Sequence, residues 1–361
     1  MEIFCVTAPG LESLLKAEAE ALGFDVKSMV PGGVTLQGEW PEVWRANQTL
    51  RGATRVLVRL TSFRAMHLAQ LDKRARKLPW SDWLRKDVPV RVDATCRKSK
   101  IYHAKAATQR IEKAVTETLG VPLAKDAPIT LKVRIEDDLC TISVDTSGES
   151  LHKRGLKQQV NKAPMRETLA SLFLRACGYD GQEPVYDPMC GSGTFPVEAA
   201  EIAVGLSPGR ARSFAFEHLS SFQGDQLPET QTAKPTALRF YGSDRDTGAI
   251  KMSRDYAERA RVNDITKFDV KSISDIVPPE GAPGLVIVNP PYGGRIGNTK
   301  PLFGLYGSMG ARLIDQFKGW RVGIITADGG LAKATGLPFE APGPIIDHGG
   351  IKIRLWQTKT L

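Results

Sequence analysis

Apolar runs and amphipathic stretches alternate regularly along the second half of the chain. Short β-branched runs such as Leu285–Val288 predict buried strands, and stretches with apolar residues at helical spacing, such as Thr247–Arg261, predict helices between them. This alternation is typical of an α/β fold with a doubly wound, mostly parallel sheet. A closing antiparallel hairpin is predicted where Pro344–His348 and Lys352–Gln357 flank two glycines. The other strands expected here are Val185–Tyr186, Leu238–Gly242, Phe268–Ile273 and Arg321–Thr326, and the other helices are Ala163–Cys177, Phe195–Val204 and Leu305–Phe317.

The first half of the chain shows short strand and helix patterns that predict a compact α+β module. Strands are expected at 2–8, Val26–Val30, Gly33–Leu36, Arg51–Leu60, Pro89–Ala94, Ile129–Ile135 and Leu139–Val144, and helices at Leu11–Leu22, His67–Leu84 and Ala104–Leu119. The polar and basic stretch Ser147–Asn161 is expected to be a linker or docking segment. Gly205–Pro235 is expected to be an inserted loop in the second half.

Positive charge is concentrated in the first half of the chain. The whole protein carries a formal net charge of +9, but residues 45–110 alone hold 17 Lys and Arg against 4 Asp and Glu, a net charge of +13. Such a local excess is the electrostatic footprint of a protein that binds a polyanion. Trp80, Trp83 and Tyr102 are interleaved with these charges, which favours nucleic acid over a basic face that is merely solvated.

Two basic patterns in this region are candidate phosphate contacts. Arg97, Lys98, Lys100 and His103 precede the helix predicted from Ala104, and the N–H groups of a helix entrance can meet an anion together with them. The second pattern has a period of two along a predicted strand and consists of Arg51, Arg55 and Arg59. It is either a binding face or the solvated side of an antiparallel sheet.

The cysteines and histidines indicate neither a metal site nor a disulfide framework. Five Cys are scattered, odd in number and without a CxxC pair, and five His are equally dispersed. This pattern favours reduced thiols in a cytoplasmic protein without a structural metal. No apolar run approaches the roughly 20 residues needed to span a bilayer. The N-terminus lacks a secretory pattern, so no membrane partner is expected.

A glycine-rich loop, DPMCGSGT, occupies Asp187–Thr194 between a predicted strand and a predicted helix. Glycines allow close backbone approach, and a strand, glycine loop and helix N-terminus together make a nucleotide-type ligand site. The loop is neither the dinucleotide GxGxxG nor a P-loop. Asp244 ends the next predicted strand, 51 residues after Gly193 (193 to 244). It is placed to accept from both hydroxyls of a ribose, or alternatively to cap the helix that begins at Thr247.

The tetrapeptide Asn289-Pro290-Pro291-Tyr292 follows the strand Leu285–Val288. Ligands of open α/β sheets bind just outside the carboxyl ends of strands. Two prolines remove two N–H donors, so the turn presents mainly acceptors, the side-chain oxygen of Asn289 and the carbonyl of Pro290, beside the ring of Tyr292. Such an edge suits a planar group that bears an NH2, as an amino-bearing nucleobase does. The alternative is a rigid turn in which Tyr292 only packs.

The sequences DPMCGSGT, GSDRD and NPPYGGRIG, in that order, resemble the motifs of class I S-adenosylmethionine-dependent methyltransferases. The upstream sequences KSKIYH and LHKRGLKQQVNKAPMRETLA are similar to those of the THUMP-containing RNA guanine-N2 methyltransferases, above all the bacterial L-type enzymes of large-subunit ribosomal RNA. The resemblance implies a ferredoxin-like subdomain at 1–50, a THUMP RNA-binding domain at 51–155 and a Rossmann-like methyltransferase domain at 156–361. Some longer relatives carry a second methyltransferase domain, and because this chain stops at Leu361 that second activity is not expected.

The resemblance also implies site residues, carried over by position. The implied cofactor residues are Pro164, Asp187, Gly191, Ser192, Gly193, Asp244 and Asn289. The residues implied to hold the target base are Asn289, Pro290 and Tyr292. Members of this family usually have an acidic residue after the third strand to meet the adenine amine. Here Ser272 occupies that position, with Asp275 as a substitute nearby.

The implied reaction is methyl transfer from S-adenosylmethionine to the exocyclic N2 amine of a guanine in RNA, with 23S ribosomal RNA as the expected substrate. Three alternatives stay open: guanine-N2 methylation of transfer RNA, adenine-N6 methylation of DNA, and a non-catalytic RNA-binding assembly factor. Cofactor binding discriminates the last of these, because intact cofactor and NPPY motifs would serve no purpose in a protein without the reaction.

Overall fold

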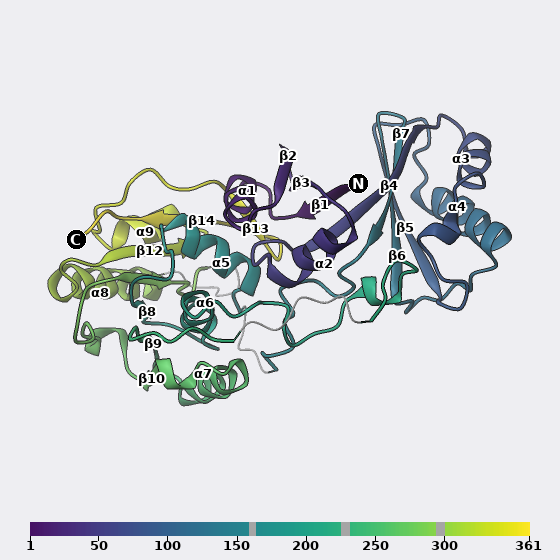
Figure 1. The fold of residues 1–361 in the computed structure, drawn as a ribbon. Helices are drawn as coiled ribbons and strands as arrows, with labels where there is room; N and C mark the ends of the chain where they lie inside the picture. The colour runs from purple at the N-terminus through teal and green to yellow at the C-terminus, as the bar shows by residue number, and fades with distance from the viewer. Residues whose placement is uncertain (159–163, 225–231, 294–299) are drawn as a thin grey trace. The chain divides into compact units, whose positions relative to one another are not determined.

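The structure is a computed structural model that describes residues 1–158, 164–224, 232–293 and 300–361 (Figure 1). It divides into two compact units. The N-terminal unit comprises Met1–Thr7, Lys16–Leu151 and Arg212–Glu229, and the C-terminal unit comprises Ala8–Leu15, His152–Ala211 and Thr230–Leu361. Among the helices of these described ranges, none combines the length and apolar character that crossing a membrane requires.

The N-terminal unit is built on a seven-stranded sheet in the order β2-β3-β1-β4-β7-β6-β5. Only β5 and β6 pair in parallel; the other neighbours are antiparallel. Strand β4 pairs with β1 along Arg55–Arg59 and with β7 along Leu57–Arg64. It therefore joins β1, β2 and β3 to β5, β6 and β7 in a single sheet. The strands are β1 Glu2–Val6, β2 Asp25–Val30, β3 Gly33–Gln37, β4 Arg55–Arg64, β5 Val90–Arg97, β6 Ile129–Glu136 and β7 Leu139–Asp145. The helices along this part of the chain are α1 Glu12–Ala21, α2 Trp40–Thr49, α3 Leu68–Ala75 and α4 Ala104–Leu119.

The C-terminal unit contains a second seven-stranded sheet in the order β10-β9-β8-β11-β12-β14-β13. Strands β8 to β12 pair in parallel, and the β13–β14 hairpin closes the sheet in antiparallel pairing against β12. This is the predicted doubly wound, mostly parallel sheet. The strands are β8 Val185–Asp187, β9 Phe240–Asp244, β10 Thr266–Val270, β11 Leu285–Val288, β12 Arg321–Thr326, β13 Ile346–His348 and β14 Ile351–Gln357. The helices are α5 Glu167–Ala176, α6 Thr194–Ala203, α7 Thr247–Ala260, α8 Lys300–Gln316 and α9 Gly329–Ala334.

Strand β11 shows why this sheet is covered on both faces. All four of its residues are fully buried. Val286 and Val288 pack in the apolar cluster that α8 helps to form, and because side chains alternate along a strand, Leu285 and Ile287 face the other side. The chain winds from β8 to β10 in one direction and from β11 to β12 in the other. The carboxyl ends of β8 and β11 therefore meet at the topological switch point, where such sheets bind ligands.

The expected inserted loop, Gly205–Pro235, contributes in part to the N-terminal unit. Its 3-10 helix Ala215–His218 lies beside the end of β7, where the N–H of Phe216 donates to the carbonyl of Thr146 at 3.0 Å. Residues 225–231 of this loop, like 159–161 of the expected linker, lie outside the described residues.

Three predicted boundaries are wrong for local reasons. Strand β4 begins at Arg55 because the preceding Arg51 lies in a turn whose N–H donates to Glu18 at 2.6 Å. The long helix expected from His67 ends early, and Pro79 separates α3 from a 3-10 turn at Trp80–Asp82. Helix α5 begins at Glu167 after an extended N-cap residue, so Pro164 precedes the helix instead of opening it.

Candidate active site

The glycine loop leaves the carboxyl end of β8 and ends in the first turn of α6. Gly191 and Gly193 have φ angles of +53° and +79°, which side chains with a Cβ rarely adopt. A Cβ at Gly193 would lie 2.9 Å from the Cβ of Ser253, so packing alone requires glycine there. A Cβ at Gly191 would meet nothing within 4 Å. Gly191 is therefore the position where a ligand has room to approach the backbone.

Asp244, at the carboxyl end of β9, is bonded to this loop. Its two carboxylate oxygens accept from the N–H groups of Gly191 (3.1 Å) and Asp246 (3.0 Å). The cap of α7 is supplied by Asp246, whose side chain accepts from the N–H of Gly248 at 2.8 Å, so the alternative role of Asp244 as a helix cap is wrong. A carboxylate has about four lone-pair sites. Two remain for the predicted ribose hydroxyls.

Asp187 places a buried carboxyl at the end of β8. The residue is 2% exposed, and one oxygen accepts from the N–H of Met189 at 3.0 Å. Burial raises the pKa of Asp187 well above its usual value; the Met189 bond opposes this shift, and repulsion from Asp244 adds to it. Within the described ranges no Lys or Arg forms an ion pair with Asp187. A buried carboxyl without a counterion fits a cationic ligand, and S-adenosylmethionine carries both a sulfonium and an ammonium group.

Lys157 links the segment that contains Pro164 to the start of α6 through hydrogen bonds and an ion pair. Its Nζ donates to the Thr194 hydroxyl at 2.8 Å and to the Met165 carbonyl at 3.3 Å, and it forms an ion pair with Glu167 at 3.3 Å. Thr194 is the last residue of the glycine loop and the first of α6. The structure thus brings the stretch that follows Pro164 close to the end of the glycine loop.

A second buried cluster lies next to Lys157 and escaped prediction. Arg154 is 3% exposed and bonds to Glu198 and Glu201 of α6, both fully buried. Arg210 bonds to the other oxygen of Glu201. The basic residues of this region predicted a linker or docking segment, and only the acidic positions on α6 show that a buried ion network is formed. The network holds α6, the helix that follows the glycine loop.

The NPPY turn leaves the carboxyl end of β11, next to β8. The side-chain oxygen of Asn289 is buried and has no hydrogen-bond partner in the described part of the chain. A buried acceptor without a donor costs about 1–3 kcal/mol, so it favours a ligand that brings an N–H group. Pro290 is buried, and Tyr292 is half-buried and packs against the apolar cluster formed with α8. Residues 294–297 of the NPPYGGRIG motif lie outside the described residues.

Ser272 and Asp275 both follow the carboxyl end of β10 at the surface. The hydroxyls of Ser272 and Ser274 lie 3.0 Å apart, and Ser274 donates to Asp275 at 3.3 Å. The two candidates for the adenine contact are therefore linked in one exposed hydrogen-bonded chain. The choice between them stays a prediction.

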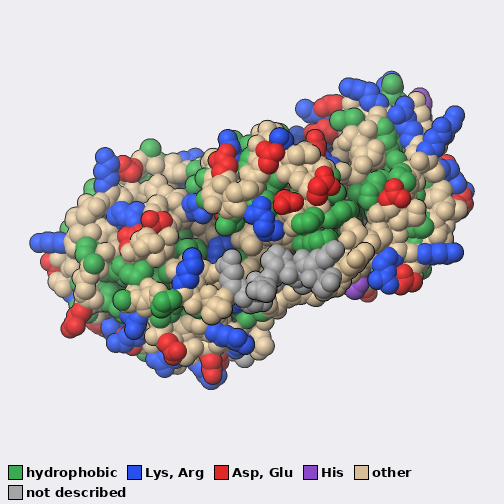
Figure 2. Space-filling model, viewed as in Figure 1, with side chains coloured by type: hydrophobic (Ala, Val, Ile, Leu, Met, Phe, Trp, Pro, Cys, Tyr) green, Lys and Arg blue, Asp and Glu red, His purple; other side chains and the backbone are tan. Residues whose placement is uncertain are grey.

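The four predicted RNA-binding residues are exposed and lie between the last residue of β5, Arg97, and the residue before α4, His103. Lys98 has a φ of +46°, and the backbone N–H of Lys100 donates to Asp138 in the β6–β7 turn at 2.8 Å, which fixes the segment. Tyr102 is 71% exposed, and its ring centroid lies 4.1 Å from that of His103. Lys and Arg side chains gather over this end of the N-terminal unit (Figure 2). An exposed aromatic among cations suits a nucleic acid.

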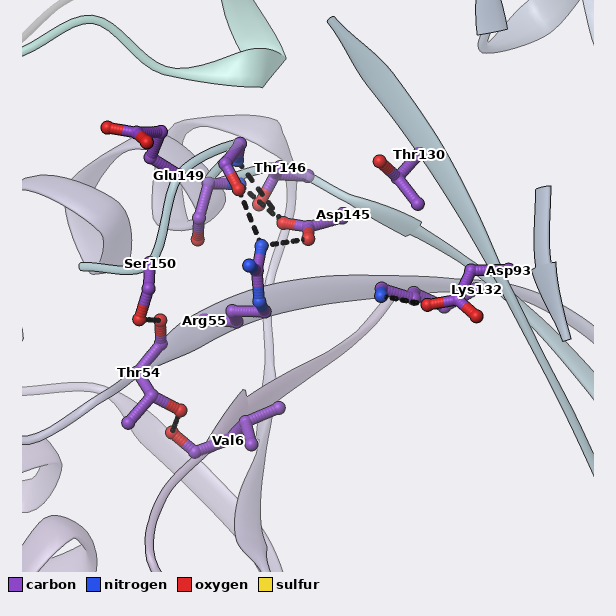
Figure 3. A network of polar contacts seen from close by, with 12 residues as sticks. Val6, Thr54, Arg55, Asp93, Thr130, Lys132, Asp145, Thr146, Glu149 and Ser150 are labelled. Carbon is purple, nitrogen blue, oxygen red and sulfur yellow. Dashed lines mark hydrogen bonds and ion pairs between the residues drawn. The ribbon is translucent and has the colours of Figure 1, made fainter. Parts of the chain in front are cut away.

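Other basic and aromatic candidates of this unit serve its own structure. Arg55 contacts Asp145 and the Gly148 carbonyl (Figure 3). Arg59 forms an ion pair with Glu2 at 2.8 Å. Arg55 and Arg59 thus form ion pairs within this unit, which favours the alternative that this is the solvated side of the sheet. Trp80 is also unavailable, because it is 2% exposed and its indole N–H donates to the Ala75 carbonyl at 2.9 Å.

The strand order, the glycine loop and the NPPY turn at the switch point define a class I methyltransferase, for which S-adenosylmethionine is the methyl donor. The family model described as the RMKL-like methyltransferase domain matches residues 154–338, preceded by the RlmL ferredoxin-like domain at 2–57 and a THUMP domain at 65–145. The chain belongs to this RMKL-like methyltransferase family.

Known proteins resemble the chain over most of its length. A curated relative from Syntrophotalea carbinolica, a ribosomal RNA large subunit methyltransferase K/L, is 33% identical over 92% of this chain and 50% of its own length. The chain thus spans about half the length of the curated relatives it matches. The solved complex of SMU.472 with SAH is 26% identical with a TM-score of 0.87, covering 100% of this chain and 98% of that one. A protein from Listeria monocytogenes str. 4b F2365, described as a predicted N6-adenine-specific DNA methylase, is 27% identical with a TM-score of 0.88, covering 100% and 96%.

Proposed function

We propose that this chain transfers a methyl group from S-adenosylmethionine to the exocyclic N2 amine of a guanine in RNA, and that the RNA is 23S ribosomal RNA. The single observation that carries the choice of an amine is the buried, unpartnered oxygen of Asn289 at the switch point. The ribosomal substrate is supported by the curated relative's activity and by the THUMP match. The exposed segment with Lys98 and Lys100 is the proposed phosphate contact.

The proposed chemistry needs positioning more than a strong base. Bound S-adenosylmethionine supplies an already activated methyl group on a sulfonium. The residues of this chain prepare the acceptor: the Asn289 oxygen and the Pro290 carbonyl accept from the two amine protons, which aims the nitrogen lone pair at the methyl group. The same acceptors stabilise the positive charge that develops on nitrogen, an electrostatic effect of the oxyanion-hole type with reversed sign. Tyr292 would stack on the guanine after it leaves its helix.

The cofactor would lie along the glycine loop. Gly191 leaves room for it, Asp244 would accept from the ribose hydroxyls, and Asp187 would face its positive charge. Ser192, Gly193 and the segment after Pro164 complete the proposed boundary. The adenine amine would meet Asp275 or Ser272 beyond β10.

The test is identification of the modified nucleoside. The full chain is incubated with methyl-labelled S-adenosylmethionine and, separately, with unmodified 23S ribosomal RNA, transfer RNA and duplex DNA, and the digested products are separated by mass spectrometry. The proposal expects N2-methylguanosine in ribosomal RNA. N2-methylguanosine in transfer RNA alone would change the substrate, and N6-methyladenine in DNA would overturn the proposal. Absence of label in every substrate together with absence of cofactor binding would favour a non-catalytic assembly factor.

A further inference from the structure

Helix α8 places a buried tyrosine against the NPPY turn. Tyr306 is 0% exposed, and its phenol oxygen lies 3.3 Å from the carbonyl oxygen of Pro291 and 3.3 Å from the hydroxyl of Thr326. Thr326 is the last residue of β12, the strand that pairs with β11. The phenol therefore bridges the carboxyl ends of two neighbouring strands at the ligand-binding edge of the sheet.

Two of the four residues of the NPPY turn cannot donate a backbone hydrogen bond. Pro290 and Pro291 have no backbone N–H, so these two residues cannot fasten the turn by donating hydrogen bonds. Their carbonyl groups can only accept. Tyr306 supplies a donor from α8, and Thr326 receives a further bond from the N–H of Asp328 at 3.2 Å. A hydrogen-bonded chain thus runs from the end of β12 through the phenol to the turn after β11.

We infer that Tyr306 is a positioning residue, which holds the Pro291 peptide so that the Asn289 oxygen and the Pro290 carbonyl stay aimed at the target amine. This inference rests on the proposed function, because it assigns those acceptors to the substrate. Tyr306 acts through the turn and does not itself contact the base. A rate that depends on acceptor placement is sensitive to small shifts, since misplacement by about 1 Å can cost roughly 10²-fold.

The phenol is suited to this role at all physiological pH values. Burial raises the pKa of Tyr306 above its usual value, and the hydrogen bond with Thr326 only partly opposes the shift. The group therefore stays protonated and remains a donor. Its ring is fixed as well, because it packs in the apolar cluster around α8.

Tyr306→Phe tests the inference because it removes the hydroxyl and keeps the ring. Single-turnover methyl transfer by the full chain should fall about 10-fold, while the dissociation constants for S-adenosylmethionine and RNA stay within about 2-fold. Tyr179→Phe is the matched control: Tyr179 is also buried and donates to a backbone carbonyl, that of Ala199 at 2.8 Å, away from the turn. It should lose similar stability and keep the rate.

Thr326 provides a second, independent arm. Thr326→Val should slow transfer and Thr326→Ser should restore it, because serine keeps the hydroxyl that meets the phenol. The inference is overturned if Tyr306→Phe keeps the wild-type rate, if its rate and its affinities fall together, or if the control Tyr179→Phe slows transfer as much as Tyr306→Phe does. Single-turnover transfer by Asn289→Ala, measured in parallel, distinguishes failure of the positioning role of Tyr306 from failure of the proposed function. If Asn289→Ala is inactive and Tyr306→Phe is fully active, only the positioning role fails; if Asn289→Ala is fully active, the proposed function fails with it.

Discussion

Replacing Arg154 with methionine should destabilise the C-terminal unit by about 3–5 kcal/mol. The Arg154 side chain is 2% exposed and contacts Glu198 and Glu201, whose side chains are 0% exposed. Methionine keeps most of the aliphatic stem and removes the guanidinium, which breaks the buried ion pair with the Glu198 carboxylate. Breaking one partner of a buried ion pair costs about 3–5 kcal/mol. Glu201 keeps Arg210, so the loss comes mainly from the ion pair between Arg154 and Glu198.

Urea denaturation of the full chain, with hydrogen exchange at the amides of α6 as the local readout, measures this loss. Arg312→Met is the matched control, because Arg312 donates to the neutral carbonyl of Ile276 at 2.7 Å and should lose only about 1 kcal/mol. Arg154→Met combined with Glu198→Leu removes both charges and should regain most of the stability. A single variant no less stable than Arg312→Met, or a double variant less stable than the single, would refute the reasoning.

Three further predictions concern the ligand sites. Because the pKa of Asp187 is raised in the folded state, stability falls as the pH rises above about 4, where the carboxyl of the unfolded chain ionises. Asp187→Asn should therefore raise the melting temperature of the ligand-free protein at pH 7 and leave it unchanged below about pH 3. Gly193→Ala should lower the melting temperature more than Gly191→Ala, whereas calorimetric titration should show that Gly191→Ala still weakens cofactor binding. Lys98→Ala combined with Lys100→Ala should weaken RNA binding and flatten its dependence on salt concentration, by about 0.7–0.9 in log–log slope for each lost phosphate contact, at unchanged cofactor affinity.

The central strands β11 and β12 of the C-terminal sheet were predictable because nearly all of their residues are buried. Leu285–Val288 and Arg321–Thr326 have the predicted boundaries, since continuous β-branched runs identify central parallel strands. Helices α2 and α9 escaped prediction for the opposite reason. The first contains Trp, Val and Thr, which are weak helix formers, and the second opens with Gly329 and Gly330 and depends on its Asp328 cap.

The sequence likewise predicted the parts of the candidate site that are contiguous in the chain, but not the contacts between residues that are far apart in the chain. The glycine loop and NPPY turn are contiguous in sequence, and their position after predicted strands was enough to place them at one edge of the sheet. The residues of the hydrogen-bonded chain that reaches the NPPY turn come from distant segments. Tyr306 and Thr326 lie 15 and 35 residues after Pro291 in the sequence (306 − 291 and 326 − 291). Arg154 meets Glu198 across 44 residues. No local pattern marks such pairs, because they are selected by packing in three dimensions.

Single-turnover methyl transfer by Asn289→Ala tests the central claim most directly. The change removes the proposed acceptor and keeps β11, both prolines and Tyr292, with exposed Asn263→Ala as the matched amide control. The account predicts that the rate of Asn289→Ala falls about 10²–10³-fold, or ~3–4 kcal/mol, while the dissociation constants for S-adenosylmethionine and RNA remain nearly unchanged and Asn263→Ala behaves as wild type. A wild-type single-turnover rate in Asn289→Ala would contradict the account and leave NPPY as a structural turn.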